Sequence, residues 1–392
     1  MTKLEQLIEE LCPNGVEYRT LNTICNVYDG THQTPQYTDS GIKFASVESI
    51  ADPYATEKYI SVSDYEKYKI KPQRNDLLMT RIGSIGVCTV IESDEPLAYY
   101  VSLALLRPDN SILNSRYLKY AIESLHCRKE LRKRTLVNAV PIKINMGDIG
   151  KITLPVPPLP VQSEIVRILD NFTELTTELT TELTARKKQY EFYRDKLLTF
   201  GDVREGATSD VIRRTLGEVC KISAGGDAPK DSMSKQKTEK YSVPIISNGI
   251  GENALYGYTD APKVEEPAVT VAARGTIGYA EYRDYPFYPI IRLLTTIPKD
   301  STVVSTKYLY YCLQGKQYSV PMGGIPQLTA PELKKVEIPI PSLDVQNRIV
   351  QVLDNFDAIC TDLSSGLPAE IEARQKQYEY YRDKLLSFEE KT

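Results

Sequence analysis

The sequence predicts an α+β protein in which two globular modules of mixed α and β structure alternate with two long helices. Two observations predict this class. Near-identical blocks with apolar residues at helical spacing occur twice along the chain. Each block follows a stretch of short apolar runs typical of strands, such as 43–50, 76–83 and 97–108 in the first stretch and 241–248, 268–275 and 290–298 in the second.

An internal repeat defines the predicted organisation. Residues 185–200 and 373–388 are identical at 13 of 16 positions, and residues 154–172 and 338–356 at 11 of 19. Such self-similarity indicates a duplicated structural unit, and the duplication predicts a pseudo-twofold arrangement of the two copies. The expected segments are a first module with a short N-terminal helix (1–153), a first helical spacer (154–200), a second module (201–337) and a second helical spacer (338–392). Because the two modules differ in sequence, we expect them to perform two different versions of one task. Because the two spacers are nearly identical, we expect both to perform the same task.

The helical blocks are expected to pair with each other. The first runs for about 40 residues without Gly or Pro, or about 60 Å. A narrow apolar stripe of that length needs a partner helix, and the other copy is the nearest candidate; a helix lying alone on a globular core is the alternative. A kink or short break is expected at Gly366-Leu367-Pro368. The predicted seam consists of Leu175, Leu179, Leu183, Tyr190, Tyr193, Leu363, Ile371, Tyr378 and Tyr381.

Composition narrows the functional classes. With 392 residues, 41% hydrophobic and 26% charged, the chain is long enough for two or three folded domains. It has neither a run of 18 apolar residues nor an apolar signal core, so we expect a cytoplasmic protein without membrane contact. Seven cysteines without a Cys-x-x-Cys pair, and two histidines, argue against disulfides and zinc. The net charge of −4 places any DNA-binding surface in local patches or on partner subunits.

No motif of a catalytic centre stands out. The sequence has no phosphate-binding P-loop and no Asn-Pro-Pro-aromatic motif of methyltransferases. Gly249–Ala254 is only a loose dinucleotide fingerprint, and the residues after it do not open a helix. We therefore expect no catalytic residue, no metal and no cofactor bound by this chain.

The remaining candidates are recognition residues. Thr31, His32 and Gln33 lie in a polar loop that either reaches base edges or forms an ordinary surface turn. Arg81 and Arg274 flank the Gly83–Gly86 and Gly275–Gly278 turns, where they either read guanine or pair with a local carboxylate. Near the end of the first module lies a basic cluster of Arg128, Lys129, Arg132, Lys133 and Arg134. This cluster either contacts phosphates or is a solvated helix face. The predicted DNA-binding set is Thr31, His32, Gln33, Arg81, Ser84, Arg128, Lys129, Arg132, Lys133, Lys143, Lys230, Lys235, Lys237, Asn248, Arg274 and Thr276.

The helical blocks carry a family resemblance over essentially the whole chain. They open with Pro-x-Pro-x-Leu or a near equivalent, continue with Val-Gln-x-x-Ile-Val, and end with Gln-Tyr-Glu-(Phe/Tyr)-Tyr-Arg-Asp-Lys-Leu-Leu. In these motifs the chain resembles the DNA-specificity (S) subunit of type I restriction–modification enzymes. The recognition modules resemble the family only in outline and in their glycine turns.

The resemblance implies a non-catalytic subunit that binds double-stranded DNA. Each module would be a target recognition domain that reads one half of a bipartite, asymmetric site. The helices would form an antiparallel coiled coil that sets the spacer and docks two modification subunits, with off-stripe residues such as Phe192 and Tyr380 at that contact. S-adenosylmethionine would bind the modification subunits, and ATP and Mg²⁺ would bind restriction subunits. The alternatives are a coiled-coil scaffold without DNA and a fused methyltransferase-nuclease.

Overall fold

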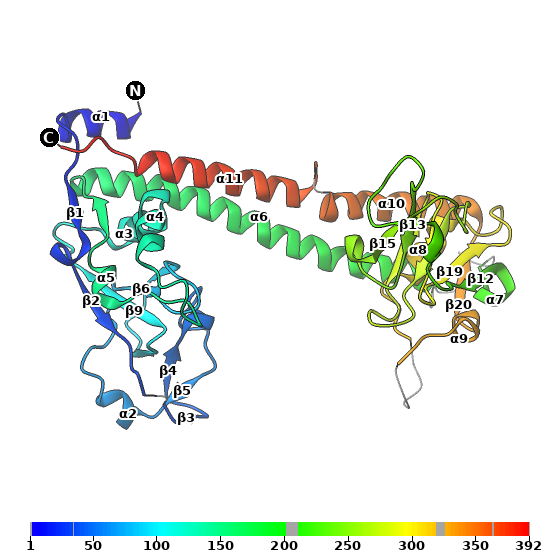
Figure 1. Cartoon of the computed structure of the whole chain (residues 1–392), viewed down its shortest axis with the longest axis horizontal. Coiled ribbons are helices and arrows are strands. Elements are labelled where there is room, and N and C mark those ends of the chain that lie inside the picture. The colour runs from blue at the N-terminus through cyan, green and yellow to red at the C-terminus, as the bar shows by residue number, and fades with distance from the viewer. Residues whose placement is uncertain (1, 34, 201–210, 319–325, 363, 392) are drawn as a thin grey trace. The chain divides into compact units, whose positions relative to one another are not determined.

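The computed structural model describes residues 2–33, 35–200, 211–318, 326–362 and 364–391. The chain forms two compact units (Figure 1): Met1–Thr180 with Glu370–Thr392, and Thr181–Ala369. Each unit contains one mixed module and two helical segments. The predicted fold class is confirmed. The predicted segment boundaries remain a prediction, as does a pseudo-twofold arrangement of the two copies.

The first unit contains three sheets and a set of short helices. Its elements are α1 (Lys3–Leu11), β1 (Tyr18–Thr20), η1 (Leu21–Thr23), β2 (Cys25–Asp29), β3 (Tyr37–Thr38), β4 (Ile42–Ala45), η2 (Val47–Ser49), β5 (Tyr59–Ile60), α2 (Val62–Glu66), β6 (Leu77–Thr80), β7 (Cys88–Val90), β8 (Leu97–Tyr99), β9 (Leu103–Pro108), α3 (Ser115–Glu123), α4 (Leu125–Arg134), α5 (Met146–Ile149), β10 (Thr153–Pro155) and the first part of α6 (Leu159–Thr199).

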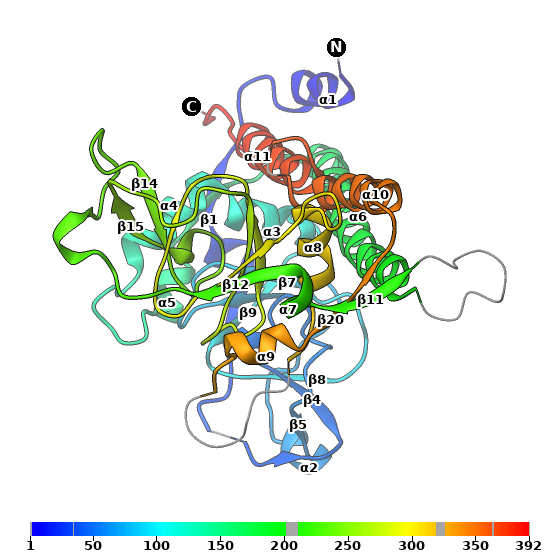
Figure 2. The same cartoon turned by 90° about the vertical axis from the view of Figure 1, so that its right-hand side faces the viewer.

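The second unit repeats the order of the strands, with differences in the short helices between them. Its elements are β11 (Ile212–Thr215), α7 (Leu216–Val219), β12 (Cys220–Ala224), η3 (Lys230–Ser232), β13 (Met233–Ser234), β14 (Val243–Ile246), η4 (Gly251–Ala254), β15 (Leu255–Thr259), β16 (Ala268–Val271), β17 (Ala280–Arg283), β18 (Tyr288–Pro289), β19 (Leu294–Pro298), α8 (Thr306–Leu313), α9 (Ala330–Lys334), β20 (Glu337–Ile340) and α10 (Leu343–Thr361). Figure 2 shows α7 and α9 beside the β11–β20 pair. Helix α11 (Leu367–Leu385) continues into the first unit.

The sheets of the two modules have the same topology. The strand orders β2-β9-β6-β7 and β3-β5-β4-β8 of the first module correspond to β12-β19-β16-β17 and β13-β15-β14-β18 of the second. In each second sheet one pair is parallel, β4 with β8 and β14 with β18, while the other pairs are antiparallel. A two-stranded antiparallel sheet, β1–β10 or β11–β20, joins the first and last strands of each module. The two modules therefore share one fold, although their sequences differ.

Equivalent tyrosines tie each module to the segment that precedes its long helix. Tyr117 on α3 and Tyr308 on α8 are fully buried, and their hydroxyls donate to the carbonyls of Pro155 and Pro339, both at 2.9 Å. Proline at these strand positions lacks an amide hydrogen, but its carbonyl still accepts a bond. The Pro-x-Pro segments thus end each module in a fixed extended conformation.

A buried glutamine at the start of each long helix makes a second tie. Gln162 accepts a bond from Asn114 N (2.8 Å) and donates to the carbonyls of Ile112 (2.8 Å) and Pro157 (2.7 Å). Gln346 repeats this pattern in the second unit, with Ser305 N, Val303 O and Pro341 O as its partners. Both side chains are fully buried. The Val-Gln pair of the repeated motif therefore serves to attach helix to module.

We expect Gln346→Leu to lower the free energy of unfolding by about 3 kcal/mol, because it removes three hydrogen bonds made by a fully buried side chain. Urea denaturation measures the change. Gln351→Leu, on the exposed face of the same helix, is the matched control and should change stability by less than about 0.5 kcal/mol. Equal effects of the two substitutions would show that the buried bonds do not anchor the helix.

The long helices pair in antiparallel fashion within each unit (Figure 1). In the first unit Phe172 of α6 stacks on Tyr381 of α11, with ring centroids 5.5 Å apart. In the second unit Tyr193 of α6 stacks on Phe356 of α10 at 5.9 Å. The expected break in the second block is confirmed, since α10 ends at Thr361 and α11 begins at Leu367.

The predicted seam residues have different environments. Tyr190 is 8% exposed, whereas Leu175, Tyr193 and Tyr381 are each more than a third exposed. Leu179, Leu183, Ile371 and Tyr378 are half-buried, and Tyr378 lies against Tyr120 of α3. Leu363 lies outside the described residues. Several stripe positions therefore pack on a module as well as on a helix, which periodicity alone does not reveal.

Candidate nucleic-acid interface

A buried ion pair holds the polar loop of the first module. The Arg81 side chain, 8% exposed, donates through Nη2 to both Asp29 carboxylate oxygens at 3.0 and 3.2 Å and through Nη1 to the Ile144 carbonyl. Asp29 also bonds His32 Nε2 at 2.8 Å. Of the two roles considered for Arg81, the structure shows the local carboxylate pair. Asp29 is thus the anchor of this loop, a role that the sequence analysis did not assign.

The loop presents the predicted polar residues to different degrees. His32 and Gln33 are exposed, and Thr31 is half-buried with its hydroxyl within 3.3 Å of the Gln33 amide. Beside them is an open pocket of about 440 Å³, lined by this loop and by Asp64–Ile70. Whether these side chains touch DNA stays a prediction.

Both glycine turns require glycine for backbone reasons. Gly83 and Gly275 have φ of 85° and 70°, and a Cβ on either would meet no atom within 4 Å, so conformation rather than space excludes other residues. Ser84 is half-buried in the first turn, and Thr276 is exposed in the second.

The arginines beside these turns are not equivalent. Arg81 occupies the position that Ala273 has in the second module, because the Arg81 and Ala273 carbonyls accept equivalent bonds from Ile144 N and Leu328 N. Arg274 therefore lies one position later, half-buried, and donates to Gln327 Oε1 at 2.6 and 3.0 Å. A shift by one residue in an extended segment reverses the side-chain direction, which explains the different environments.

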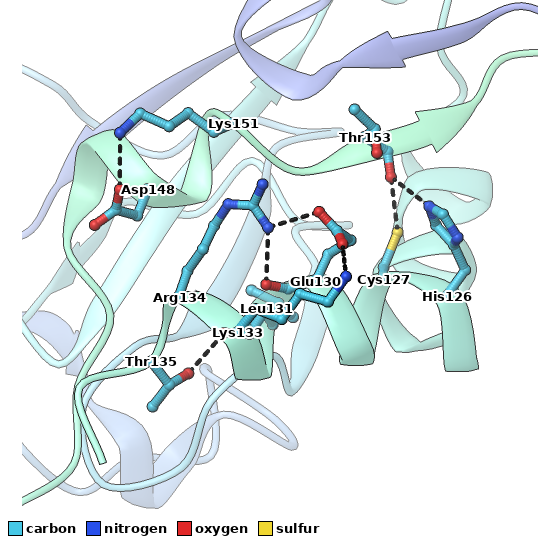
Figure 3. Close-up of polar contacts among 10 residues, drawn as sticks. All are labelled: His126, Cys127, Glu130, Leu131, Lys133, Arg134, Thr135, Asp148, Lys151 and Thr153. Carbon is cyan, nitrogen blue, oxygen red and sulfur yellow. Dashed lines mark hydrogen bonds and ion pairs between the residues drawn. The ribbon is translucent and has the colours of Figure 1, made fainter. Parts of the chain in front are cut away.

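The basic cluster lies on α4 (Figure 3). Cys127 and Leu131 pack inward, while Arg128, Lys129 and Arg132 are exposed. Glu130 pairs with Lys133 at 2.9 Å and with Arg134 at 2.6 Å, and these hydrogen bonds lower the pKa of its carboxyl group. Two of the cluster's positive charges thus have a local counter-charge.

Lys143 belongs to the same neighbourhood as α4. It forms isolated bridges with Ile82 and Leu136, and the Gly83 amide donates to Ile142 O at 2.9 Å. The segment after α4 therefore runs beside the first glycine turn and places exposed Lys143 opposite Ile82. Among the described residues, the second module has no counterpart of α4 after α8.

One of the predicted lysines of the second module, Lys235, lies against an exposed aromatic ring. Lys235 lies 3.7 Å from the centre of the Tyr256 ring and donates to the Tyr256 carbonyl at 3.0 Å. Lys230 and Lys237 are exposed. Asn248 is half-buried and uses its amide internally, donating to Ile291 O at 2.5 Å and accepting from Ala273 N at 2.7 Å.

Within the described ranges, no group of three or more His, Cys, Asp or Glu residues is arranged to hold a metal ion. In the same ranges, no helix is both long and apolar enough to span a membrane.

Comparison with known proteins identifies the family. The family model described as "Type I restriction modification DNA specificity domain" matches twice, over residues 13–187 and 209–373. The chain therefore belongs to the type I restriction–modification DNA-specificity family.

Individual relatives agree with this assignment. The chain is 37% identical over 298 residues to a putative type I specificity subunit of Mycoplasma pneumoniae, covering 72% of this chain and 85% of that protein. It is 35% identical over 268 residues to the EcoR124I/EcoR124II specificity subunit of Escherichia coli, covering 61% and 63% of the two chains. A solved chain from work on complex assembly of the type I R-M system matches with a TM-score of 0.63 at 16% identity, over 95% of this chain and 98% of that one. This last likeness supports the fold.

Proposed function

We propose that this chain is the non-catalytic subunit that selects the DNA target of a type I restriction–modification complex. Each module reads one half of a bipartite site. Because the modules share a topology but differ in sequence and in loop contacts, the two half-sites differ and the site is asymmetric. The observation that carries this proposal is the pair of family matches, each covering one module and the start of its helical block.

Partner subunits complete the proposed activity. Phe192 and Tyr380 occupy equivalent positions in the two repeated blocks, and both are 62% exposed. Large apolar rings in such positions favour burial against another protein. We assign them to contacts with two modification subunits, which carry S-adenosylmethionine, while restriction subunits carry ATP and Mg²⁺. A DNA target inside the cell places this complex in the cytoplasm.

The test is to express the chain with its modification subunits in a host without other methyltransferases and to map adenine methylation across the genome. The proposal expects two unlike half-sites at a constant separation. Absence of sequence-selective methylation would favour a scaffold without DNA. Transfer of a labelled methyl group by the purified chain alone would favour a fused methyltransferase.

The exposed arginines of α4 are proposed to contact phosphates. Replacing Arg128, Arg132 and Lys133 by alanine should weaken binding to all sequences alike and reduce the slope of log K against log salt by about one unit per lost contact. Lys133→Ala alone is the internal comparison and should have a smaller effect, because Glu130 already neutralises that charge. A triple variant with the wild-type salt slope would return α4 to the role of a solvated face.

A further inference from the structure

The turns after β8 and β18 differ between the two modules. Tyr100 and Ile290 open these turns, and their amides donate at 2.9 Å to the ends of the equivalent strands β4 and β14. Counting from these two residues makes Ser102 and Arg292 structurally equivalent. The same position therefore carries a small polar residue in one module and a large cation in the other.

In the first module this position is internal. Ser102 is 7% exposed. Its carbonyl accepts from Arg81 N at 2.9 Å, and its hydroxyl accepts from Val47 N at 3.2 Å. Ser102 therefore joins the turn to two neighbouring segments and has no surface to offer a ligand.

In the second module the backbone turns the position outward. Ile291 and Arg292 have φ of 53° and 61°, a left-handed conformation that is strongly disfavoured for a β-branched residue. Ile291 is 48% exposed, and Arg292 is also exposed. Within the described part of the chain, the Arg292 guanidinium makes no hydrogen bond or ion pair. Strained backbone of this kind persists only where the surroundings fix it, and it concentrates at functional sites.

Asn248 supplies part of that fixation. Its Oδ1 accepts a hydrogen bond from Ala273 N. In the first module the equivalent amide, Arg81 N, donates to the Ser102 carbonyl instead. Its Nδ2 donates to Ile291 O. The Asn248 side chain thus replaces the hydrogen bond that the Ser102 carbonyl makes in the first module. It also holds the left-handed turn at Ile291 and Arg292 in place.

The Gly225–Gly226 loop, which follows β12, supplies the remainder. Ile291 N donates to Gly226 O at 2.8 Å, and Arg292 N donates to Gly225 O at 2.9 Å. A Cβ on Gly225 would lie 2.7 Å from Ile290 N, so the loop approaches closely only because glycine is present. The backbone of Arg292 is therefore fixed against the Gly225–Gly226 loop, and its exposed side chain leaves the module from a defined position.

We propose that Arg292 is a base-reading residue of the second module and that Asn248 is its positioning residue. The inference rests on the proposed function and specifies where the second half-site is read. Phosphate contacts serve every sequence and tolerate flexible side chains, whereas reading a base edge needs a defined direction. A strained turn found in one module only, carrying an arginine without a partner among the described residues, suits the second task. The ligand chemistry is the O6/N7 edge of a guanine, which an arginine fork binds with two hydrogen bonds.

The experiment uses the complex with modification subunits and a library of DNA targets with single substitutions in both half-sites. Arg292→Ala and Arg292→Lys should each reduce discrimination at one position of the second half-site by about tenfold to a hundredfold. Asn248→Asp retains the acceptor for Ala273 N but loses the donor to Ile291 O, so it should weaken discrimination at that same position. Lys221→Ala, which removes an exposed charge on β12, is the matched control and should leave every preference unchanged.

Two results would overturn the inference. One is unchanged discrimination by Arg292→Ala in a complex that still methylates selectively. The other is a Lys variant that behaves like wild type while the Ala variant binds all sequences more weakly, which would identify a phosphate contact. A wild-type complex without sequence preference would instead contradict the proposed function.

Discussion

Deleting one Thr-Glu-Leu-Thr repeat from residues 173–184 is expected to shorten the unread spacer of the DNA target by about one base pair and to leave both half-sites unchanged. The three tandem repeats lie within helix α6, where the chain passes from the first unit to the second. Four residues contribute about 6 Å of helix and about 40° of net rotation. One base pair advances about 3.4 Å and turns roughly 35°. The rotations nearly match, so we expect both modules to keep their grooves while the separation changes, with the difference in length absorbed by a tilt of the coil.

The contacts of the repeat make this change tolerable. The hydroxyls of Thr173, Thr176 and Thr177 donate to carbonyls four residues earlier in the same helix. Glu174, Glu178 and Glu182 are all exposed. Local bonds of this kind re-form when the repeat number changes.

Methylation mapping of two-repeat and four-repeat variants measures the outcome. The control is a substitution of equal length, Thr177→Ala with Thr181→Ala, which should keep the original spacer. A two-repeat variant that stays active on the unaltered spacer would mean that the repeat does not set the separation.

Exchanging the first module for that of another family member is expected to replace one half-site completely and leave the other intact. The structure improves the choice of junction. Strand β10 pairs with β1, and Tyr117 binds the Pro155 carbonyl, so an exchange ending at residue 153 would divide this contact set. If the junction lies after Pro157, both strands of the β1–β10 pair come from the same parent protein.

Testing both junctions side by side distinguishes a change in DNA specificity from a loss of stable folding of the chain. The later junction should give a stable chain with one new half-site by methylation mapping, and the earlier one should lower the melting temperature. A change in both half-sites would contradict independent reading by the two modules.

The helical part of the fold was predictable because its signals are periodic and repeated. The stripe, the Pro-x-Pro openings and the interruption at Gly366 fixed the positions of α6, α10 and α11. The sheets were harder to predict. Residues 97–108 form one apolar run, yet they divide at Tyr100–Ser102 into strands of two different sheets. Apolar runs record burial but not sheet membership.

Candidate site residues were predictable by type more than by role. Arg81 and Asn248 were selected as polar residues beside turns, and both have internal partners that are distant in sequence. Arg292 is not among the predicted site residues because it lies in the run 290–298, which predicts a strand, whereas β19 begins only at Leu294. Aligning the two copies of this run sets Arg292 against Ser102, and that contrast was the available signal.

The pairing of β1 with β10 and of β11 with β20 also has a genetic consequence. Each module enters and leaves its structure through adjacent strands, and the near-identical blocks follow directly in the sequence. A crossover between homologous genes inside a block therefore cuts neither module. Under the proposed function, recombination at these blocks would pass on intact modules in new combinations, so specificity would diversify by reassortment of folded modules.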